Sequence, residues 1–140
     1  MLPEFSVETE IEIPFHDVDV MHVAWHGHYA KYMEIARCKL LDSIDYNYPQ
    51  MKESGYSWPV IDLRIRYVNP AKFRQKIRVK ATLVEWENRL RIKYLLSDAA
   101  TGKKLTKAQT DQVAVDMQTG EMLLASPRVL WEKLGIAEEF

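Results

Sequence analysis

Hydrophobic and polar positions along the chain change their period several times, and each change marks a predicted element. Residues 6–13 alternate Val and Ile with acidic residues, which predicts a first strand. From Tyr29 onward the period becomes helical and predicts a largely buried helix of about four turns, ending before Tyr46 because Pro49 follows. The apolar positions of this helix are Tyr29, Tyr32, Met33, Ala36, Leu40, Leu41 and Ile44.

After the helix the pattern changes to period two. Apolar residues alternate with Arg and Lys over residues 63–67, 76–83 and 89–96, so each segment predicts a half-buried strand with one apolar and one basic face. Residues 85–88 are few enough to join the second and third strands as a hairpin. We therefore expect an antiparallel sheet made of consecutive hairpins.

Turn and cap signals define the last third of the chain. Gly102 and Gly120, each preceded by Thr, bound a further predicted strand through Gln112–Asp116. Ser126, followed by Pro, predicts the N-cap of a last helix, and Gly135 stands where that helix would end.

One long helix and a sheet with one apolar face can bury each other when the sheet wraps around the helix. The sequence therefore predicts an α+β hot-dog fold, in which an antiparallel β-sheet surrounds a long central α-helix. The chain has 140 residues and shows no internal repeat or linker, so we expect a single domain over residues 1–140.

Composition excludes several classes of protein. A single cysteine, Cys38, rules out an intrachain disulfide framework and a cysteine-only zinc site. The apolar runs fall far short of the roughly 20 residues that a membrane span needs. The acidic, weakly apolar start of the chain is unlike a signal or transit peptide, and we expect a cytoplasmic protein.

The charge is unevenly distributed although the formal net charge is only −1. Residues 64–93 contain ten basic and two acidic residues, whereas the rest of the chain contains nine basic and eighteen acidic ones. Such a region suggests an anionic partner, for example the phosphates of a cofactor-like substrate, an acidic carrier protein or nucleic acid. A solvated basic sheet face is the structural alternative. The pI of about 6.4 and the lack of a recognition motif argue against nucleic acid.

The chemistry-bearing residues lie in residues 15–29, just ahead of the long helix. This segment contains two carboxylates, Asp17 and Asp19, and all four histidines of the chain. The N-terminus of a helix stabilises negative charge on a ligand or a developing oxyanion. A nearby Asp could act as general base or nucleophile, and a His could orient water or carry a proton. One hypothesis is therefore a metal-free hydrolytic site formed by Asp19 and His26.

Two alternatives remain open. A metal-dependent hydrolase could bind zinc or iron through imidazole and carboxylate ligands, although no His-Glu-x-x-His or paired-cysteine motif is present. The ligands would come from His16, Asp17, His22, His26 and His28. Alternatively, the histidines are structural and cap the helix or pack against aromatic side chains.

The segment Phe15–Arg37, FHDVDVMHVAWHGHYAKYMEIAR, resembles the signature of the hot-dog acyl-CoA thioesterases of the hydroxybenzoyl-CoA thioesterase type, including the Tol-Pal-associated branch. The matching positions are Asp17, Asp19, His26, Tyr29, Glu34, Ala36 and Arg37. The resemblance continues through Tyr67–Phe73. The chain departs from the signature in three places: Val18 replaces Thr or Cys, Met21-His22 stands where many members have Gly, and Trp25 replaces Tyr or Asn. We expect these differences to affect the choice of substrate more than the type of reaction.

The resemblance implies a thioester hydrolase acting on acyl-CoA or acyl-carrier-protein substrates, with no metal and no cofactor. It assigns Asp19 as the nucleophile or the base that activates water, and His26 as its companion. Asp17 and Tyr29 become supporting residues, and basic strand residues become candidates for the CoA phosphates. It also implies a homo-oligomer, a dimer or a tetramer. A non-catalytic hot-dog domain that binds acyl-CoA or nucleic acid is the alternative.

Overall fold

The computed structural model describes residues 5–136. In chain order its elements are β1 (Phe5–Glu12), two 3-10 helices (Phe15–Asp17 and His26–His28), α1 (Tyr29–Ser43), α2 (Tyr48–Ser54), β2 (Tyr56–Ser57), β3 (Val60–Tyr67), β4 (Lys76–Glu85), β5 (Leu90–Asp98), β6 (Lys104–Gln112), β7 (Val115–Asp116) and α3 (Arg128–Leu134). The predicted long helix and the strands over residues 6–13, 76–83 and 89–96 are confirmed.

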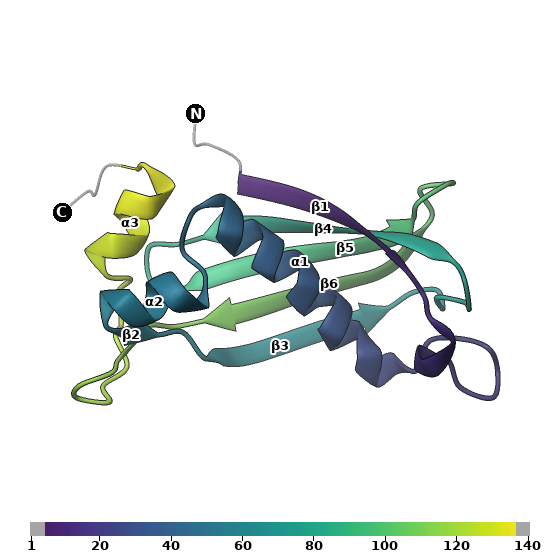
Figure 1. Ribbon diagram of the computed structural model, residues 1–140, viewed down its shortest axis with the longest axis horizontal. Coiled ribbons are helices and arrows are strands. Elements are labelled where there is room, and N and C mark those ends of the chain that lie inside the picture. The colour runs from purple at the N-terminus through teal and green to yellow at the C-terminus, as the bar shows by residue number, and fades with distance from the viewer. Residues whose placement is uncertain (1–4, 137–140) are drawn as a thin grey trace.

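The main sheet has five antiparallel strands in the order β1-β4-β5-β6-β3, and it curves behind α1 (Figure 1). β4 and β5 form the predicted hairpin, and β6 follows β5 as the next antiparallel strand. The expectation of consecutive hairpins is wrong for β3, which pairs with β6 at the far edge and not with β4. The connection over residues 68–75 crosses the end of the sheet, where Ala24 N–H donates to Ala71 O (2.7 Å) and Phe73 N–H donates to His22 O (3.1 Å).

The helix α1 fills the concave side of the sheet. All seven apolar residues predicted for it are buried, and none is more than 7% exposed. The alternating residues of β4 and β5 face it, and Ile77, Val79, Leu90 and Ile92 are completely buried. The antiparallel sheet wrapped around a central helix is thus confirmed as an α+β hot-dog arrangement.

A second short helix, α2, follows α1 directly and was not predicted from the pattern. Asn47 caps it, because its side chain accepts a hydrogen bond from Tyr48 N–H (2.8 Å) and its own N–H donates to Gln50 Oε1 (3.0 Å). Pro49 lies in the first turn of α2, where a missing backbone N–H removes no intrahelical hydrogen bond. The proline therefore separates two helices and does not end helical structure altogether.

Two further predictions were wrong near the C-terminal end. The strand through Gln112–Asp116 is interrupted, because β6 ends at Gln112, whose Nε2 donates to Trp58 O (2.7 Å), while β7 pairs with β2 in a separate small sheet. Ser126 is not the N-cap of α3; Pro127 occupies that position, and Ser126 N–H donates to Glu87 O (2.8 Å). Gly135 ends α3 in the left-handed region, as predicted.

The strand β3 is exposed on both sides and so differs from the predicted half-buried strand. It forms an edge of the sheet, and both Leu63 and Tyr67 are 47% exposed although they lie on its apolar face. The helix α1 packs mainly against β1 and β4 and leaves this edge uncovered. Among residues 5–136, none of the helices is long and apolar enough to cross a membrane.

Candidate active site

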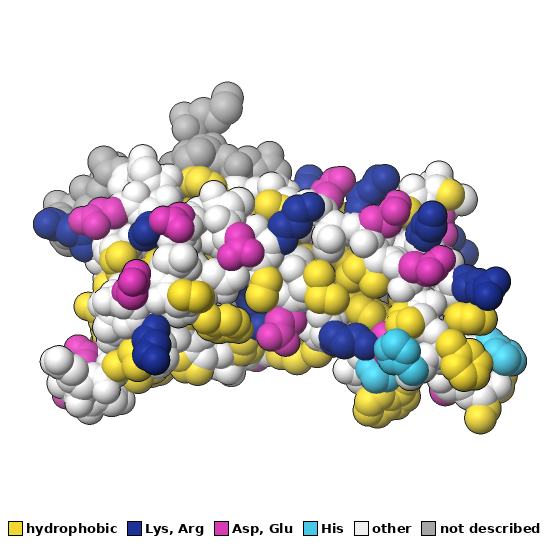
Figure 2. Space-filling view, in the orientation of Figure 1, with side chains coloured by type: hydrophobic (Ala, Val, Ile, Leu, Met, Phe, Trp, Pro, Cys, Tyr) yellow, Lys and Arg dark blue, Asp and Glu magenta, His cyan; other side chains and the backbone are white. Residues whose placement is uncertain are grey.

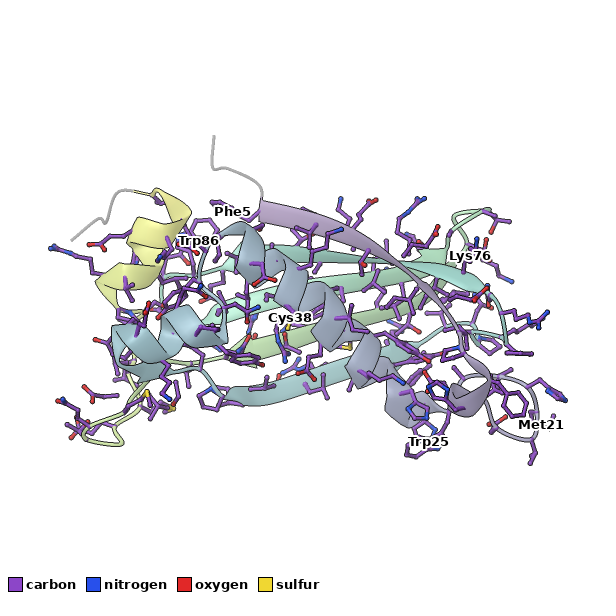
Figure 3. The ribbon with its side chains drawn as sticks, in the orientation of Figure 1. Phe5, Met21, Trp25, Cys38, Lys76 and Trp86 are labelled. Atoms are coloured by element: carbon purple, nitrogen blue, oxygen red, sulfur yellow. The ribbon has the colours of Figure 1, made fainter. Side chains whose placement is uncertain are left out.

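The segment with the predicted chemistry forms a loop at one end of the molecule, beside the N-terminus of α1. Figure 3 places Met21 and Trp25 at this end, far from Phe5 and Trp86 at the other. Figure 2 shows the histidine side chains gathered there next to exposed apolar side chains. An antiparallel bridge between Val18 and Ala24 closes the loop on itself, and a second one between Val23 and Lys72 joins it to the crossing segment over residues 68–75. These bridges hold an irregular segment in one conformation.

Asp17 is the buried carboxylate of the loop, with no exposed side-chain surface. Lys31 Nζ donates to both of its carboxylate oxygens, at 2.7 Å and 2.6 Å, and Tyr32 Oη donates to Oδ2 at 2.7 Å. Two imidazoles lie further away: His16 Nε2 is 3.5 Å and His28 Nδ1 is 3.9 Å from Oδ1. The carboxylate thus ties the loop to the first turn of α1.

This environment acts on both partners of the Asp17–Tyr32 hydrogen bond. Burial by itself raises the pKa of the Asp17 carboxyl, but the hydrogen bonds from Lys31 and Tyr32 and the charge of Lys31 together hold this pKa below its usual value. Burial and the neighbouring carboxylate raise the pKa of the Tyr32 hydroxyl. Asp17 is therefore an ionised anchor that stays unprotonated at neutral pH.

Asp19 occupies the exposed tip of the same loop. Its Oδ1 accepts a hydrogen bond from Met21 N–H (2.8 Å), its carbonyl accepts one from His22 N–H (3.0 Å), and its N–H donates to Val23 O (3.0 Å). His22 adopts a positive φ of 61°, a left-handed conformation that Gly adopts without strain. The turn directs the Asp19 carboxylate outward, where a substrate can reach it.

His26 and Gly27 begin the helical stretch that continues into α1, and the first N–H groups of such a stretch have no intrahelical acceptor. The Trp25 ring lies against Gly27: a Cβ added there would be 2.3 Å from the ring, so any larger residue requires the ring to move. The His26 carbonyl accepts a hydrogen bond from Tyr67 Oη (3.0 Å), so β3 supports the turn. The His26 side chain is exposed.

Tyr29 is buried and connects the start of α1 to the crossing segment. Its Oη accepts a hydrogen bond from Ala71 N–H (3.1 Å), and its ring packs against Tyr67 with 5.0 Å between ring centroids. Burial raises the pKa of the Tyr67 hydroxyl, and Tyr29 adds to that shift. Tyr29 and Tyr67 thus form an aromatic support under the turn that carries His26.

The structure separates the four predicted site residues into two groups. Asp17 and Tyr29 are buried and hold the loop and the helix start in place, whereas Asp19 and His26 are exposed. Within residues 5–136 no hydrogen bond or ion pair joins Asp19 to His26. Lys31 and Tyr67, which support the site, were not predicted. Tyr67 was expected on the apolar face of a strand and in the segment covered by the resemblance, and Lys31 was not singled out.

The donors of the metal hypothesis do not assemble into a ligand set. No group of three or more His, Cys, Asp or Glu side chains in the described part of the chain is placed to hold a metal ion. Two of the five proposed ligands, His22 and His26, are exposed on separate turns of the loop. The carboxylate of Asp17 is occupied by the ammonium group of Lys31.

Comparisons with known proteins agree with this architecture. A candidate esterase of Synechocystis sp. is 27% identical over 134 residues, which is 91% of this chain and 77% of that protein. The crystal structure of a DHNA-CoA thioesterase from Staphylococcus aureus is 27% identical, with a TM-score of 0.76 over 85% of this chain and 80% of the other. Slr0204, a 1,4-dihydroxy-2-naphthoyl-CoA thioesterase from Synechocystis, shares the fold with a TM-score of 0.82 at 18% identity, over 93% of this chain and 96% of the other.

The family comparison covers most of the chain. The model of the thioesterase-like superfamily matches residues 13–134, from the residue after β1 to the end of α3. This range includes the loop with Asp17 and Asp19, the whole of α1 and the remaining strands of the sheet. The chain therefore belongs to the thioesterase-like superfamily.

Proposed function

We propose that this protein hydrolyses acyl thioesters. Its substrates are acyl-CoAs, or the same acyl groups bound as thioesters to a carrier protein. Its family membership supports this reaction. The observation that carries the site assignment is the exposed Asp19 carboxylate, held by a tight turn in the loop that leads directly into the α1 helical stretch. A thioester carbonyl placed between them meets a base and an electrostatic stabiliser together.

The proposed chemistry needs only residues of this chain and water. The N–H of His26, at the start of the helical stretch, polarises the thioester carbonyl. Asp19 removes a proton from water as the water oxygen adds to the carbonyl carbon, or it attacks that carbon itself and forms an anhydride that water then cleaves. In both cases the C–S bond breaks, the thiolate leaves and takes up a proton, and a carboxylic acid remains.

The other predicted residues act through these two. Asp17 holds the loop on Lys31 and Tyr32, so its role is to position Asp19 and not to react. Tyr29 fixes the crossing segment against which the loop pairs. The His26 side chain, as the companion of Asp19, would contact the substrate or its water from the exposed side of the turn.

A homo-oligomer is the second part of the proposal. The edge strand β3 presents an unpaired set of backbone N–H and C=O groups together with exposed apolar side chains, a combination that favours pairing with another chain. The exposed apolar residues are Val60, Ile61, Leu63, Tyr67 and Val68. Pairing of two β3 strands would give a dimer, which could assemble further into a tetramer. Because Tyr67 supports the His26 turn, this interface would adjoin the site.

The remaining parts of the proposal concern the chain as a whole. We propose that one hot-dog domain accounts for residues 1–140 and that the protein acts in the cytoplasm. A single cysteine supports the second point, since a protein of this size in an oxidising compartment commonly has disulfides.

The deciding experiment measures thiol release from short-chain, long-chain and aromatic acyl-CoAs after treatment with a chelator. Wild type, Asp19→Asn and Glu53→Gln are compared, the last being a control at an exposed carboxylate on α2. We expect turnover that survives the chelator, persists in Glu53→Gln and falls by a factor of about 100 or more in Asp19→Asn. Equal turnover by wild type and Asp19→Asn would refute the role of Asp19. Restoration of activity by added zinc or iron alone would favour the metal alternative.

A further inference from the structure

The face of the main sheet that points away from α1 has two adjoining shallow depressions, of about 380 Å³ and about 310 Å³. Both are lined by Lys93, Lys107 and Ala108. The side chains around them include six cations and no carboxylate. We call this set the basic face: Arg64, Arg66, Lys80, Lys93, Lys104 and Lys107.

Strand register explains why these cations lie together. Lys80 on β4 is opposite Leu95 on β5, which is opposite Lys107 on β6, which in turn is opposite Arg66 on β3. In the next row Lys93 is opposite Gln109, and Gln109 is opposite Arg64. Neighbouring strands are about 4.8 Å apart, so the basic face extends roughly 14 Å across the sheet.

The carboxylates on this side of the sheet stand opposite cations or are paired with them, including two members of the basic face, Lys80 and Arg64. Those of β1 stand opposite the basic residues of β4: Glu8, Glu10 and Glu12 pair in register with Lys80, Arg78 and Lys76. Arg91 Nε holds Asp111 at 2.8 Å, and Arg64 Nε holds Asp62 at 3.0 Å.

Four members of the basic face are left without such compensation. Within residues 5–136, Arg66, Lys93, Lys104 and Lys107 have no ion-pair partner. Positive charge on this side of the sheet is therefore concentrated over β5, β6 and β3. The opposite side of the molecule differs, since Lys, Arg, Asp and Glu are mixed over it in Figure 2.

The basic face lies near the site in the fold. β3 ends and β6 begins at the end of the molecule that carries the loop of Asp19 (Figure 1). Arg66 directly precedes Tyr67, whose hydroxyl donates to His26 O, and Lys104 O accepts from Asn69 Nδ2 (2.8 Å). The β3–β6 part of the basic face therefore extends toward the end of the molecule that carries the proposed thioester site.

Two possible occupants fit this surface poorly. A second copy of the chain, packed sheet against sheet, would bring the central Lys93 and Lys107 against the same residues of its partner, and like charges repel. Single-stranded nucleic acid binds through cationic grooves with exposed aromatic side chains on which bases stack. Neither depression offers one: Tyr94 lines the larger depression but is only 3% exposed, and the lining of the smaller one contains no aromatic residue.

We propose that the basic face docks an acidic carrier protein that delivers the thioester on its pantetheine arm. This inference rests on the proposed function, because CoA and carrier proteins share that arm. Four uncompensated cations, spread over the three strands β3, β5 and β6, match an acidic protein surface better than the few phosphates of one CoA nucleotide. Charges of opposite sign steer such a partner to the surface and set its orientation.

The test compares one acyl group on two carriers, as acyl-CoA and as the matching acyl-carrier protein of a bacterial fatty-acid synthase. The variant is Lys93→Glu/Lys107→Glu. The matched control, Lys39→Glu/Lys76→Glu, changes the net charge equally at exposed lysines outside both depressions. We expect the Lys93→Glu/Lys107→Glu variant to lose at least about tenfold in kcat/KM on acyl-carrier protein, with its acyl-CoA kinetics unchanged. Lys93→Gln/Lys107→Gln should show a smaller loss of the same kind.

Other results would overturn the docking proposal. Equal losses on both substrates would assign the basic face to the phosphates of CoA. Unchanged kinetics on both would remove any role in delivery. Binding of labelled holo-carrier protein, followed by fluorescence anisotropy at low and high salt, tests docking without hydrolysis. Salt-sensitive binding of the carrier without turnover would support docking and refute the thioesterase proposal. Binding of a single-stranded RNA instead of the carrier would refute docking.

Discussion

Lys31 Nζ lies 2.6 Å from Oδ2 of Asp17, and the side chain of Asp17 has no contact with solvent. This ion pair joins the first turn of α1 to the loop that presents Asp19. The Lys31 side chain itself is 45% exposed, so the pair is buried on the acidic side only. The ion pair thus fixes the base of the loop to α1, while the loop tip with Asp19 remains exposed to solvent.

We predict that Lys31→Met destabilises the fold by about 1–3 kcal/mol, because it leaves a buried carboxylate with fewer hydrogen bonds and no counter-charge. Urea unfolding of the wild type, Lys31→Met, Asp17→Asn and the double variant measures the coupling between the two residues. Lys39→Met, a change of the same kind at an exposed position of α1, is the control. Additive effects of the two substitutions would contradict a direct Asp17–Lys31 interaction.

The lowered pKa of Asp17 predicts a pH dependence of stability. An unfolded Asp has a pKa of about 3.9, and the folded value is below it, so the unfolded state binds more protons between the two values. The stabilisation is fully present above the unfolded pKa and is lost as the pH falls through the folded pKa. Unfolding free energies measured from pH 6 down to pH 2 should therefore fall less steeply in Asp17→Asn than in wild type. Parallel slopes would show that Asp17 contributes nothing to acid sensitivity.

Gly27 should tolerate a side chain only when Trp25 is removed. In Gly27→Ala the new Cβ would meet the Trp25 ring at 2.3 Å, so the half-exposed indole must move and the His26 turn moves with it. We expect about a tenfold loss of kcat/KM, corresponding to about 1.4 kcal/mol of transition-state stabilisation. In a Trp25→Ala background the same substitution should cost much less. An equal loss in both backgrounds would show that the clash with Trp25 is not the cause.

The exposed edge strand predicts how the oligomer can be broken. Leu63→Lys places a charge on the uncovered apolar face of β3 and should shift the protein toward its monomer mass of 16.4 kDa, with a parallel loss of activity. Light scattering after size-exclusion chromatography reads the mass directly. Leu124→Lys, at a leucine that is 85% exposed outside the sheet, is the control and should leave the mass unchanged. An intact oligomer in Leu63→Lys would place the interface elsewhere.

The period of the apolar residues was enough to predict α1 and the hairpin of β4 and β5, because a buried face imposes its period on the sequence wherever one element packs on another. It could not predict α2, whose start depends on the local hydrogen bonds of Asn47 and Gln50. Nor could it place β3 beside β6, since strand order depends on a connection that crosses the end of the sheet.

For the candidate site, too, the sequence predicted some features and the tertiary structure decided others. The sequence by itself determined which carboxylates and imidazoles lie ahead of α1, because they are consecutive along the chain and resemble a known signature. Only the tertiary structure decided that Asp17 is buried on Lys31 while Asp19 is exposed, and that Tyr67, 41 residues from His26, supports its carbonyl. Burial and long-range hydrogen bonds depend on how distant segments pack, and the order of residues along one segment does not specify that packing.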